Sequence, residues 1–447
     1  MADSAMRIDD LINGKKISRL QVVTLLLCFL VVAVDGFDVA AAGYVAPLLK
    51  REWALGVHQL GLVFGAGLFG LTVGSFVLGP LADKIGRKRT IMVAMVLFGI
   101  GSLLTAAAPS IGWLIALRFL TGVGLGGGMP CAITLSSEYS PERHRPMLVT
   151  LMFCGFTLGL AFGGQLAALI MPTFGWRGVF MAGGIAPLLL LPVIGYWLPE
   201  SVRFMAGKKK FENETRTLLV RLTGDAALDV HQFLRRQPEE PLISAQPSAT
   251  LFNAHYRAGT MLLWLAFFCT LWVYYQISSW LPSVLADSGM TVAQSAQVGS
   301  ILPISGTIGA IINAVLMRRM NPYLVLTGSY ILAAISIVCI GSAMTSPGLL
   351  ALAVCCAGLG LSGAQTGANV LVAGFYTTNA RATGVSWALG VGRIGSIFGS
   401  ITGGMLLAML ETPDKAFFVF ALPALIAAAA MFVMGRVYCT KAVGVTA

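Results

Sequence analysis

Two aspartates, Asp35 and Asp38, lie three residues apart in an otherwise apolar stretch, CFLVVAVDGFDVAAAGY. On a helix this spacing places both carboxylates on one face. A carboxylate inside a bilayer costs at least ~2.5–3.5 kcal/mol and is rare outside functional positions. Because a bound proton removes the charge, the pair predicts a site that takes up and releases a proton. The alternative is that both side chains lie in water at the outer mouth of a helix bundle.

Two arginines also lie in apolar stretches, Arg118 in IGWLIALRFLTGVGLGGGMP and Arg393 in RATGVSWALGVGRIGSIFGS. At a rise of about 1.5 Å per residue, Arg118 has a depth similar to that of Asp35, and Arg393 lies near the middle of its stretch. Guanidinium groups match carboxylates in charge and geometry. We therefore expect Arg118 to join an ion pair or proton relay and Arg393 to bind an anionic ligand. Structural ion pairs with the aspartates are the alternative.

Further polar and aromatic side chains in these stretches are candidates for a substrate site. Gln365 and Asn369 are four residues apart and share one helix face. Aromatic rings gain ~0.5–1.5 kcal/mol by stacking, although Trp and Tyr also gather at membrane interfaces. The aromatic candidates are Phe37, Tyr44, Trp264, Tyr274, Tyr275, Trp280 and Trp387.

The elements that position these residues are predicted to be membrane-spanning helices. Of the 447 residues, 57% are hydrophobic and only 11% are charged, against about 25% charged in soluble domains. This composition excludes a soluble enzyme and a disordered chain, and the long unbroken apolar runs are not those of a β-barrel. Apolar spans of about 20 residues are expected near 20–44, 57–82, 90–109, 111–136, 147–171, 177–198, 258–285, 292–317, 322–344, 348–373, 382–410 and 416–437.

The spans form two groups of six, which predicts an all-α membrane protein with two six-helix lobes. The expected divisions are a cytoplasmic N-terminus at 1–19, a first lobe at 20–198, a cytoplasmic central loop at 199–257, a second lobe at 258–437 and a cytoplasmic C-terminus at 438–447. In this orientation 24 of the 30 Lys and Arg residues are cytoplasmic and four lie outside, as the positive-inside rule requires. The same bias explains the net charge of +11 without nucleic acid as a partner.

The eight cysteines and four histidines show no spacing typical of a disulfide framework or a metal site. Nearly all the cysteines lie in apolar runs, where Cys packs as a small hydrophobic residue. We therefore expect no metal and no cofactor. The polar N-terminal segment precedes a full-length span, which does not resemble a cleavable signal peptide.

The loop GPLADKIGRKRT resembles the signature loop of the major facilitator superfamily, G-x-L-a-D-r-x-G-r-k. Two further motifs resemble that family: Arg118-x3-Gly122-x-Gly124, associated with proton coupling, and PESVRF at 199–204. The resemblance implies a major facilitator fold in which Gly79, Asp83, Gly86 and Arg87 take part in gating, with Asp83 at a helix N-terminus or beside an arginine.

A faint internal repeat connects the two halves. EYSPERHRPM follows the fourth span and FYTTNARATG follows the tenth, so both halves place a Tyr and an Arg at the same cytoplasmic elbow. We therefore count Arg381 among the gating candidates. One departure concerns the loop between the eighth and ninth spans, where Arg318 replaces the acidic residue that the family often has. A symmetric second gate based on that acid is therefore not expected.

DGFD at 35–38, RFLTGVGLGGGMP, SEYSPER at 137–143, MFCGF at 152–156 and RATGVSWALGVGRIG at 381–395 together resemble the aromatic acid:H+ symporters. The similarity covers nearly the whole chain except the central loop. It implies import of an aromatic carboxylate (4-hydroxybenzoate, protocatechuate, benzoate, gentisate or hydroxyphenylpropionate) with a proton, by alternating access, across the inner membrane of a bacterium. The family's DGxD pair falls on Asp35 and Asp38 and its eleventh-helix arginine on Arg393. We expect a monomer.

Three alternatives stay open at this point. A proton-coupled efflux antiporter often has the fifth-helix motif G-x3-G-P-x2-G-G; here the glycines are present, but Leu160 replaces the proline. A carrier for another organic anion fits the two arginines equally well, and a sugar carrier fits them less well. A membrane enzyme or sensor would need a metal cluster, a nucleophile or a folded soluble domain, and the sequence predicts none of these.

Overall fold

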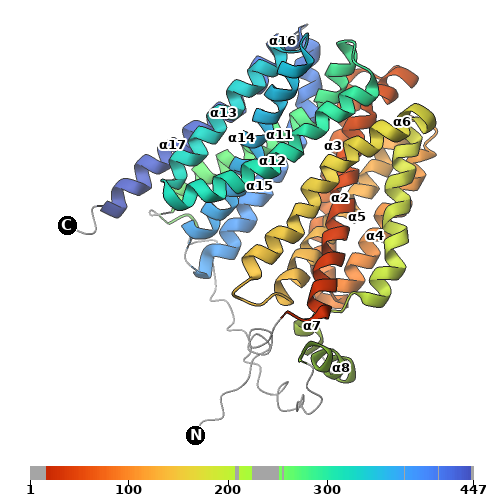
Figure 1. Cartoon of the computed structure of the whole chain (residues 1–447), viewed down its shortest axis with the longest axis vertical. Helices are drawn as coiled ribbons and strands as arrows, with labels where there is room; N and C mark the ends of the chain where they lie inside the picture. The colour runs from red at the N-terminus through yellow and green to blue at the C-terminus, as the bar shows by residue number, and fades with distance from the viewer. Residues whose placement is uncertain are drawn as a thin grey trace. The chain divides into compact units, whose positions relative to one another are not determined.

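The computed structural model describes residues 17–206, 211–223, 251–253, 256–376, 378–410 and 412–443, and within these ranges it contains helices and no strand (Figure 1). The long helices are α2 (Arg19–Glu52), α3 (Val57–Ile85), α4 (Arg87–Ala106), α5 (Ile111–Glu138), α6 (Arg145–Trp197), α11 (Arg257–Asp287), α12 (Val292–Arg319), α13 (Pro322–Ser342), α14 (Pro347–Phe375), α15 (Thr378–Met409) and α17 (Leu422–Val443). The short helices are α7 (Val202–Ala206), α8 (Glu212–Thr223) and α16 (Pro413–Phe420).

Eleven helical segments of the described chain are long and apolar enough to cross a bilayer. One of them, α6, has 53 residues and covers two predicted spans. Its backbone leaves helical geometry at Gly175, where φ is 62° and ψ is −164°, a conformation that glycine adopts without the steric penalty of a side chain. The predicted all-helical membrane fold is thus confirmed, with α6 built from two helical arms. The cytoplasmic placement of the termini stays a prediction.

The helices form two compact units, and α2, α3 and α6 pass from one to the other. Unit 1 comprises Met1–Val39, Phe69–Gly159 and Phe180–Leu242. Unit 2 comprises Ala40–Leu68, Leu160–Val179 and Ile243–Ala447. The division into lobes at 20–198 and 258–437 stays a prediction.

Small residues on α5 allow its neighbours in unit 1 to approach closely. A Cβ added to Gly124 would lie 2.7 Å from the backbone nitrogen of Phe98 on α4, and one added to Gly126 would lie 2.5 Å from that of Ser75 on α3. Both distances are too short for any side chain. Glycine at these two positions therefore allows the helices to pack closely, as is usual for small residues between membrane helices.

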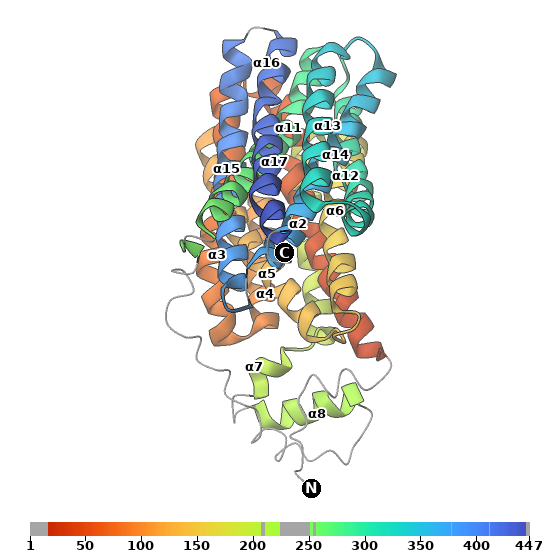
Figure 2. The same ribbon diagram turned by 90° about the vertical axis from the view of Figure 1, so that its left-hand side faces the viewer.

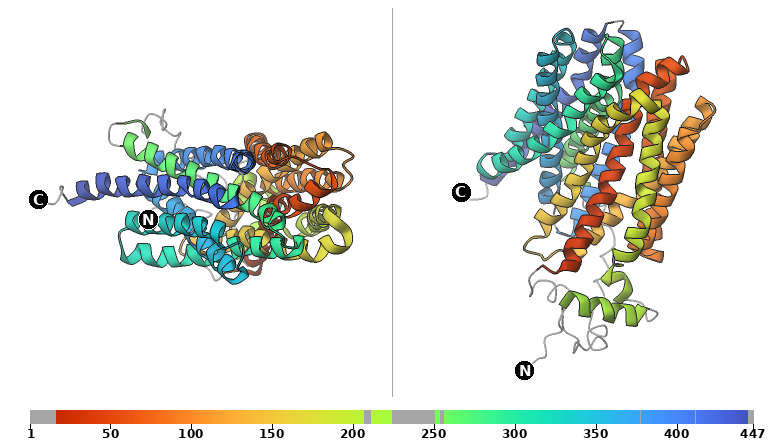
Figure 3. Two further views of the ribbon diagram at one scale, coloured as in Figure 1. Left: turned by 90° about the horizontal axis from the view of Figure 1, so that it is seen from above. Right: turned by 45° about the vertical axis from the view of Figure 1, so that its right-hand side comes forward.

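Unit 2 contains α11 to α17, drawn from green to blue, which run side by side in the views of Figures 2 and 3. Helix α11 packs on α15 and α17, and α14 packs on α12 and α13. Their shared core is aliphatic and includes Ile277, Ile337 and Val354, each fully buried. This packing holds α11 and α15 against each other, and these two helices carry Tyr275 and Arg393.

The polar segment after α6 contains the short helices α7 and α8. Helix α8 buries Leu218 and Leu219 and exposes Arg216 and Thr217, the pattern of an amphipathic helix. In Figure 2 it runs across the direction of the long helices of unit 1. An amphipathic helix in this orientation suits the interface between a bilayer and water.

Candidate functional site

The first site lies in unit 1, where Asp38 on α2 meets Arg118 on α5. Arg118 Nη1 lies 2.9 Å from Asp38 Oδ2 and 3.0 Å from Oδ1, and Nη2 donates to the backbone carbonyl of Asp38 at 3.3 Å. Asp38 is 0% exposed and Arg118 is 3% exposed. An ion pair that is this well buried is only weakly screened by water or salt. The expected contact between Arg118 and the aspartates is therefore present, and its partner is Asp38.

Two neighbouring groups hold this ion pair in place. The guanidinium of Arg118 lies 5.3 Å from the centre of the Phe180 ring, within the range of a cation–π contact. Ser102 Oγ on α4 donates to the Phe180 carbonyl at 3.0 Å and lies 3.4 Å from Asp38 Oδ1. Four helices, α2, α4, α5 and the second arm of α6, thus contribute to one buried polar cluster.

Asp35 lies one helical turn before Asp38 and has a different environment. It is 4% exposed, and its Oδ2 atom has no hydrogen-bond partner within the described ranges. No described cation lies within ion-pair distance of it. The space beside it exists because α5 carries Gly128 there: an added Cβ would lie 3.3 Å from Asp35 Oδ2. A buried carboxylate without a cation is strongly disfavoured in its charged form, so Asp35 is the acidic group best suited to bind a proton.

The second site lies in unit 2, where Arg393 on α15 and Tyr275 on α11 interact electrostatically. Among the residues that the structure describes, no carboxylate lies within ion-pair distance of Arg393. The ring of Tyr274 meets that of Tyr275 edge to face, with centroids 5.6 Å apart. The site therefore combines an uncompensated cation with aromatic surface, which suits an aromatic anion.

The remaining substrate candidates lie in three separate settings. Gln365 Nε2 points to Asn369 Oδ1 at 3.4 Å on α14, and Gln365 Oε1 is buried without a partner in the described structure. Trp387 is 50% exposed and stacks on Trp264 at 5.4 Å. The ring of Phe37 packs against α6, 3.0 Å from where a Cβ on Gly183 would lie. The role of these residues in binding stays a prediction.

Gln276 is a polar residue that the sequence analysis did not single out. It follows Tyr275 on α11, is 1% exposed, and neither atom of its amide group has a hydrogen-bond partner in the described structure. Buried amides are normally paired, so Gln276 is an additional candidate for contact with a polar ligand. A glutamine within an apolar span, next to two tyrosines, is the signal that could have identified it.

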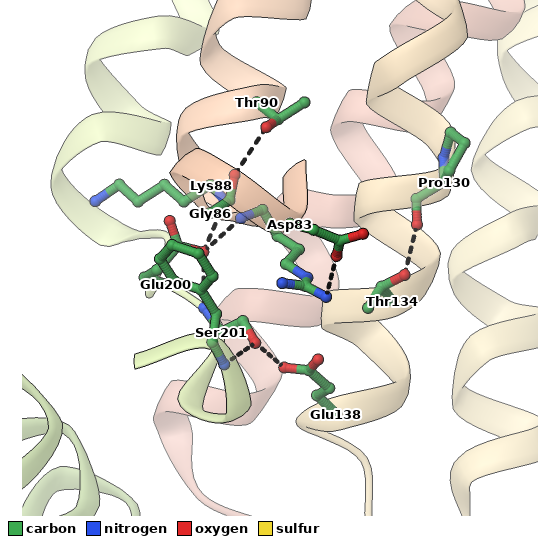
Figure 4. A network of polar contacts seen from close by, with 11 residues as sticks. Asp83, Gly86, Lys88, Thr90, Pro130, Thr134, Glu138, Glu200 and Ser201 are labelled. Carbon is green, nitrogen blue, oxygen red and sulfur yellow. Dashed lines mark hydrogen bonds and ion pairs between the residues drawn. The ribbon is translucent and has the colours of Figure 1, made fainter. Parts of the chain in front are cut away.

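A third polar cluster lies where α3 ends and α4 begins, and Figure 4 shows its members. Glu200 Oε1 accepts hydrogen bonds from the backbone nitrogens of Arg87 at 2.7 Å and Lys88 at 3.0 Å. It therefore caps the N-terminus of α4, where a negative charge is stabilising. Asp83 instead pairs with Arg87 Nη2 at 2.9 Å. Of the two expected partners of Asp83, the structure shows the arginine.

Glycine at position 86 is required by this cap. Gly86 has φ 103°, and a Cβ there would collide with the Glu200 carboxylate. Gly79, by contrast, has open space around it within 4 Å. The side chain of Arg381 lies outside the described residues, although its backbone belongs to α15.

The same cluster extends to the end of α5. Tyr139 donates its hydroxyl to the Glu200 carbonyl at 2.6 Å, and burial raises the pKa of this phenol well above its ordinary value. Ser201 Oγ donates to the carboxylate of Glu138. Glu200 was missed as a functional residue, although its motif, PESVRF, was recognised, because a carboxylate that caps a distant helix has no local sequence signature.

An exposed ion pair lies in unit 2 between α2 and α11. Lys50 Nζ lies 2.6 Å from Asp287 Oδ2, and their side chains are 33% and 56% exposed. Between these helices, a Cβ on Gly43 would lie 2.8 Å from the Ser278 carbonyl oxygen. Pairs with this exposure contribute at most ~1 kcal/mol.

The sequence model of the Major Facilitator Superfamily matches residues 28–356. The chain belongs to the major facilitator superfamily. It is 40% identical over 442 residues to the 4-hydroxybenzoate transporter PcaK of Acinetobacter baylyi, covering 98% of this chain and 96% of that protein. It is also 40% identical over 446 residues to the gallate transporter of Pseudomonas putida, covering 100% of this chain and 98% of that one.

The fold of this transporter is similar to that of a solved transporter. The partially occluded, inward-open structure of the xylose transporter XylE from E. coli matches with a TM-score of 0.72 and 15% identity, over 93% of this chain and 98% of XylE. At this identity the similarity concerns the fold alone. The chain is thus a multi-pass membrane transporter and not an enzyme.

Proposed function

We propose that this transporter imports an aromatic carboxylate together with a proton across the inner membrane of a bacterium. The observation that carries the proposal is Arg393, a cation within an apolar helix that has no carboxylate partner in the described structure. A substrate carboxylate would provide the missing charge. The names of the two 40% identical relatives, transporters of 4-hydroxybenzoate and of gallate, support an aromatic ring on that carboxylate.

The proton step is assigned to Asp35. Asp38 has its charge balanced by Arg118, whereas Asp35 is buried with no cation beside it. Binding of a proton neutralises Asp35 and removes the cost of its charge in a low-dielectric environment. A carboxylate of this kind shifts the balance between transporter conformations when its protonation changes, which is the requirement for coupling.

Recognition of the ring is assigned to the aromatic surface beside Arg393. Tyr275 interacts electrostatically with the guanidinium, and Tyr274 meets Tyr275 edge to face. An aromatic ligand stacked there gains ~0.5–1.5 kcal/mol beyond its burial. Gln276 follows Tyr275 on α11, and its unpaired amide offers both a donor and an acceptor to a polar ligand.

Purified protein in liposomes with an imposed pH gradient tests the proposal. Wild type should accumulate labelled 4-hydroxybenzoate against its gradient when the source side is acidic. Asp35→Asn should lose accumulation but retain exchange of labelled for unlabelled substrate, because binding at Arg393 is intact. Asp287→Asn, which removes an exposed carboxylate, is the matched control and should accumulate substrate like wild type. If Asp35→Asn accumulates substrate normally with an unchanged pH profile, the proton route lies elsewhere.

The same liposomes separate import by symport from the alternatives. A proton-coupled efflux antiporter would accumulate substrate when the pH gradient is reversed. A carrier for another organic anion would show competition by aliphatic acids as strong as that by benzoates. Either result would replace the aromatic symport proposal with the corresponding alternative.

We assign a gating role to the cluster around α4, which contains Asp83 and Arg87. The side chain of Asp83 is 72% exposed, and its ion-pair partner in the described structure is Arg87, four residues later in the chain. It is therefore available to exchange partners during the transport cycle. Asp83→Asn should lower the maximal transport rate more than it weakens binding at equilibrium. A large loss of affinity with an unchanged maximal rate would contradict this assignment.

A further inference from the structure

A cavity of about 660 Å³ lies within unit 1, where α4 begins and α6 ends. Its walls come from these two helices and from α7 and α8. None of Asp35, Asp38 or Arg118 lines it, so it is distinct from the buried ion-pair site. Its volume falls in the range of ~300–1,000 Å³ that is common for ligand sites.

The cavity has one basic edge and one apolar wall. Lys88, Arg89 and Arg221 line the basic edge. Lys88 Nζ donates to the Gly195 carbonyl at 2.7 Å, and the guanidinium of Arg89 lies 5.7 Å from the centre of the Phe211 ring. Arg221 is exposed on α8. These three cations come from two helices and face one space.

Two carboxylates also line the cavity, and they differ in availability. Glu200 is engaged by the N-terminus of α4. Glu214 is exposed on α8 and interacts electrostatically with Lys88. Three cations and two carboxylates thus line the cavity, which leaves one positive charge in excess, so the edge favours an anion.

The apolar wall and the aromatic residues beside it indicate contact with lipid. Met92, Phe204 and Leu218 contribute apolar surface to the cavity. Tyr196 and Trp197, at the end of α6, are 84% and 56% exposed and also line it. Exposed Tyr and Trp at the end of an apolar helix are typical of the headgroup level of a bilayer.

We propose that this cavity binds an anionic phospholipid, with its phosphate at Arg89 and Arg221 and its glycerol and upper acyl chains along the apolar wall. Basic pockets at the ends of membrane helices bind anionic headgroups, and an inorganic anion would gain nothing from the apolar wall. The lipid would contact both α4 and α8. It would thereby hold the amphipathic helix α8 against the start of α4, next to the cluster of Asp83, Arg87 and Glu200.

Native mass spectrometry of the full-length transporter tests the proposal, with phosphatidylglycerol and phosphatidylcholine as probes. Wild type should retain phosphatidylglycerol in preference to phosphatidylcholine after detergent exchange. The double variant Arg89→Gln/Arg221→Gln should weaken phosphatidylglycerol binding roughly ten- to thirty-fold, since each basic residue at a membrane surface contributes on the order of a few-fold. The double lysine variant, Arg89→Lys/Arg221→Lys, should restore most of the binding because it keeps the charges.

Arg216→Gln is the matched control. Arg216 is exposed on the same helix, α8, but does not line the cavity, so its removal should leave lipid binding unchanged. The proposal is overturned if Arg216→Gln loses as much lipid as the double variant, since that result would mean that the general positive charge of the surface, and not the cavity, attracts the lipid. It is also overturned if the double variant binds like wild type, or if millimolar inorganic phosphate displaces the lipid, which would identify a site for a soluble anion.

Discussion

Arg118 and Arg393 are both arginines within apolar helices, yet their surroundings are opposite. Arg118 in unit 1 is 3% exposed and forms an ion pair with a fully buried carboxylate, Asp38. Arg393 in unit 2 is only partly buried and interacts electrostatically with a tyrosine, and no carboxylate lies within ion-pair distance of it in the described part of the chain. The same residue type therefore has its charge balanced in one unit and unbalanced in the other.

This difference predicts a structural and coupling role for the first site and a binding role for the second. A balanced charge is stable without a ligand, and its removal leaves the partner charge buried and uncompensated. An unbalanced charge is stable only with water or an anionic ligand beside it, and its removal affects the ligand more than the fold. The comparison predicts that variants of the first site change stability and that variants of the second change affinity.

The largest effect is expected at the Asp38–Arg118 pair. Asp38→Ala leaves Arg118 as an uncompensated buried cation, and removal of one partner of such a pair costs ~3–5 kcal/mol. Thermal unfolding of the purified protein should show a large loss of stability. The double variant Asp38→Ala/Arg118→Leu should be more stable than Asp38→Ala alone. If the single variant is as stable as wild type, the pair does not hold α2 to α5.

The next effect is expected at Arg393 and concerns affinity. Loss of a hydrogen bond to a charged group costs ~1.5–3 kcal/mol, so Arg393→Ala should bind aromatic acids roughly ten- to 150-fold more weakly. Arg393→Lys should recover only part of the affinity because the bidentate geometry is lost. Unfolding temperature should change little.

Matched acid and amide ligands complete the test at Arg393. In a binding titration, wild type should bind benzoates much more tightly than the corresponding benzamides, and Arg393→Ala should discriminate little between them. Equal binding of acid and amide by wild type would contradict the assignment, and Arg118 would become the next candidate.

A smaller effect is expected at Glu200, a carboxylate held by backbone N–H groups instead of a guanidinium. Glu200→Gln removes the charge that stabilises the N-terminus of α4 but keeps one acceptor oxygen, so the expected cost is about 0.5–1 kcal/mol. The unfolding temperature should fall by a few degrees at most, and Glu200→Ala should lower it further. An unchanged unfolding temperature for Glu200→Ala would show that water replaces this cap.

The smallest effect is expected at the exposed pair, Lys50 and Asp287. Its members resemble Asp38 and Arg118 in charge but not in burial. Because water screens exposed charges, Lys50→Gln should cost ~0.2–1 kcal/mol, and the cost should decrease further at high salt. Comparison of its unfolding curve with that of Asp38→Ala measures the contribution of burial directly. A loss as large as that of Asp38→Ala would mean that exposure does not explain the difference.

Several features of the site followed from residue type and position in the chain. A charge within an apolar stretch is visible without a structure, which is why Asp35, Asp38, Arg118 and Arg393 were all identified. The signature loop containing Asp83 was recognised in the same way, because its residues are contiguous. The apolar spans predicted the helices, since each span needs only its own residues to satisfy its backbone hydrogen bonds.

Other features needed contacts between distant residues. Asp35 and Asp38 share one helix face and a similar depth, so spacing alone did not decide which one pairs with Arg118. The packing of α5 against α2 brings Arg118 to Asp38 and leaves Asp35 beside Gly128 without a cation among the described residues. Likewise, Glu200 reaches the start of α4 from 113 residues away.

The sequence by itself determined that the chain spans a membrane, that its fold is all-helical and which charged residues lie within apolar stretches. Hydrophobicity and charge are properties of individual residues and short stretches, so no tertiary contact is needed to read them. Only the tertiary structure decided which of those charges are balanced. Electrostatic stabilisation falls steeply with distance and depends on burial, and both quantities arise when helices far apart in the chain pack together. The contrast between a paired Arg118 and an unpaired Arg393 is a consequence of that packing.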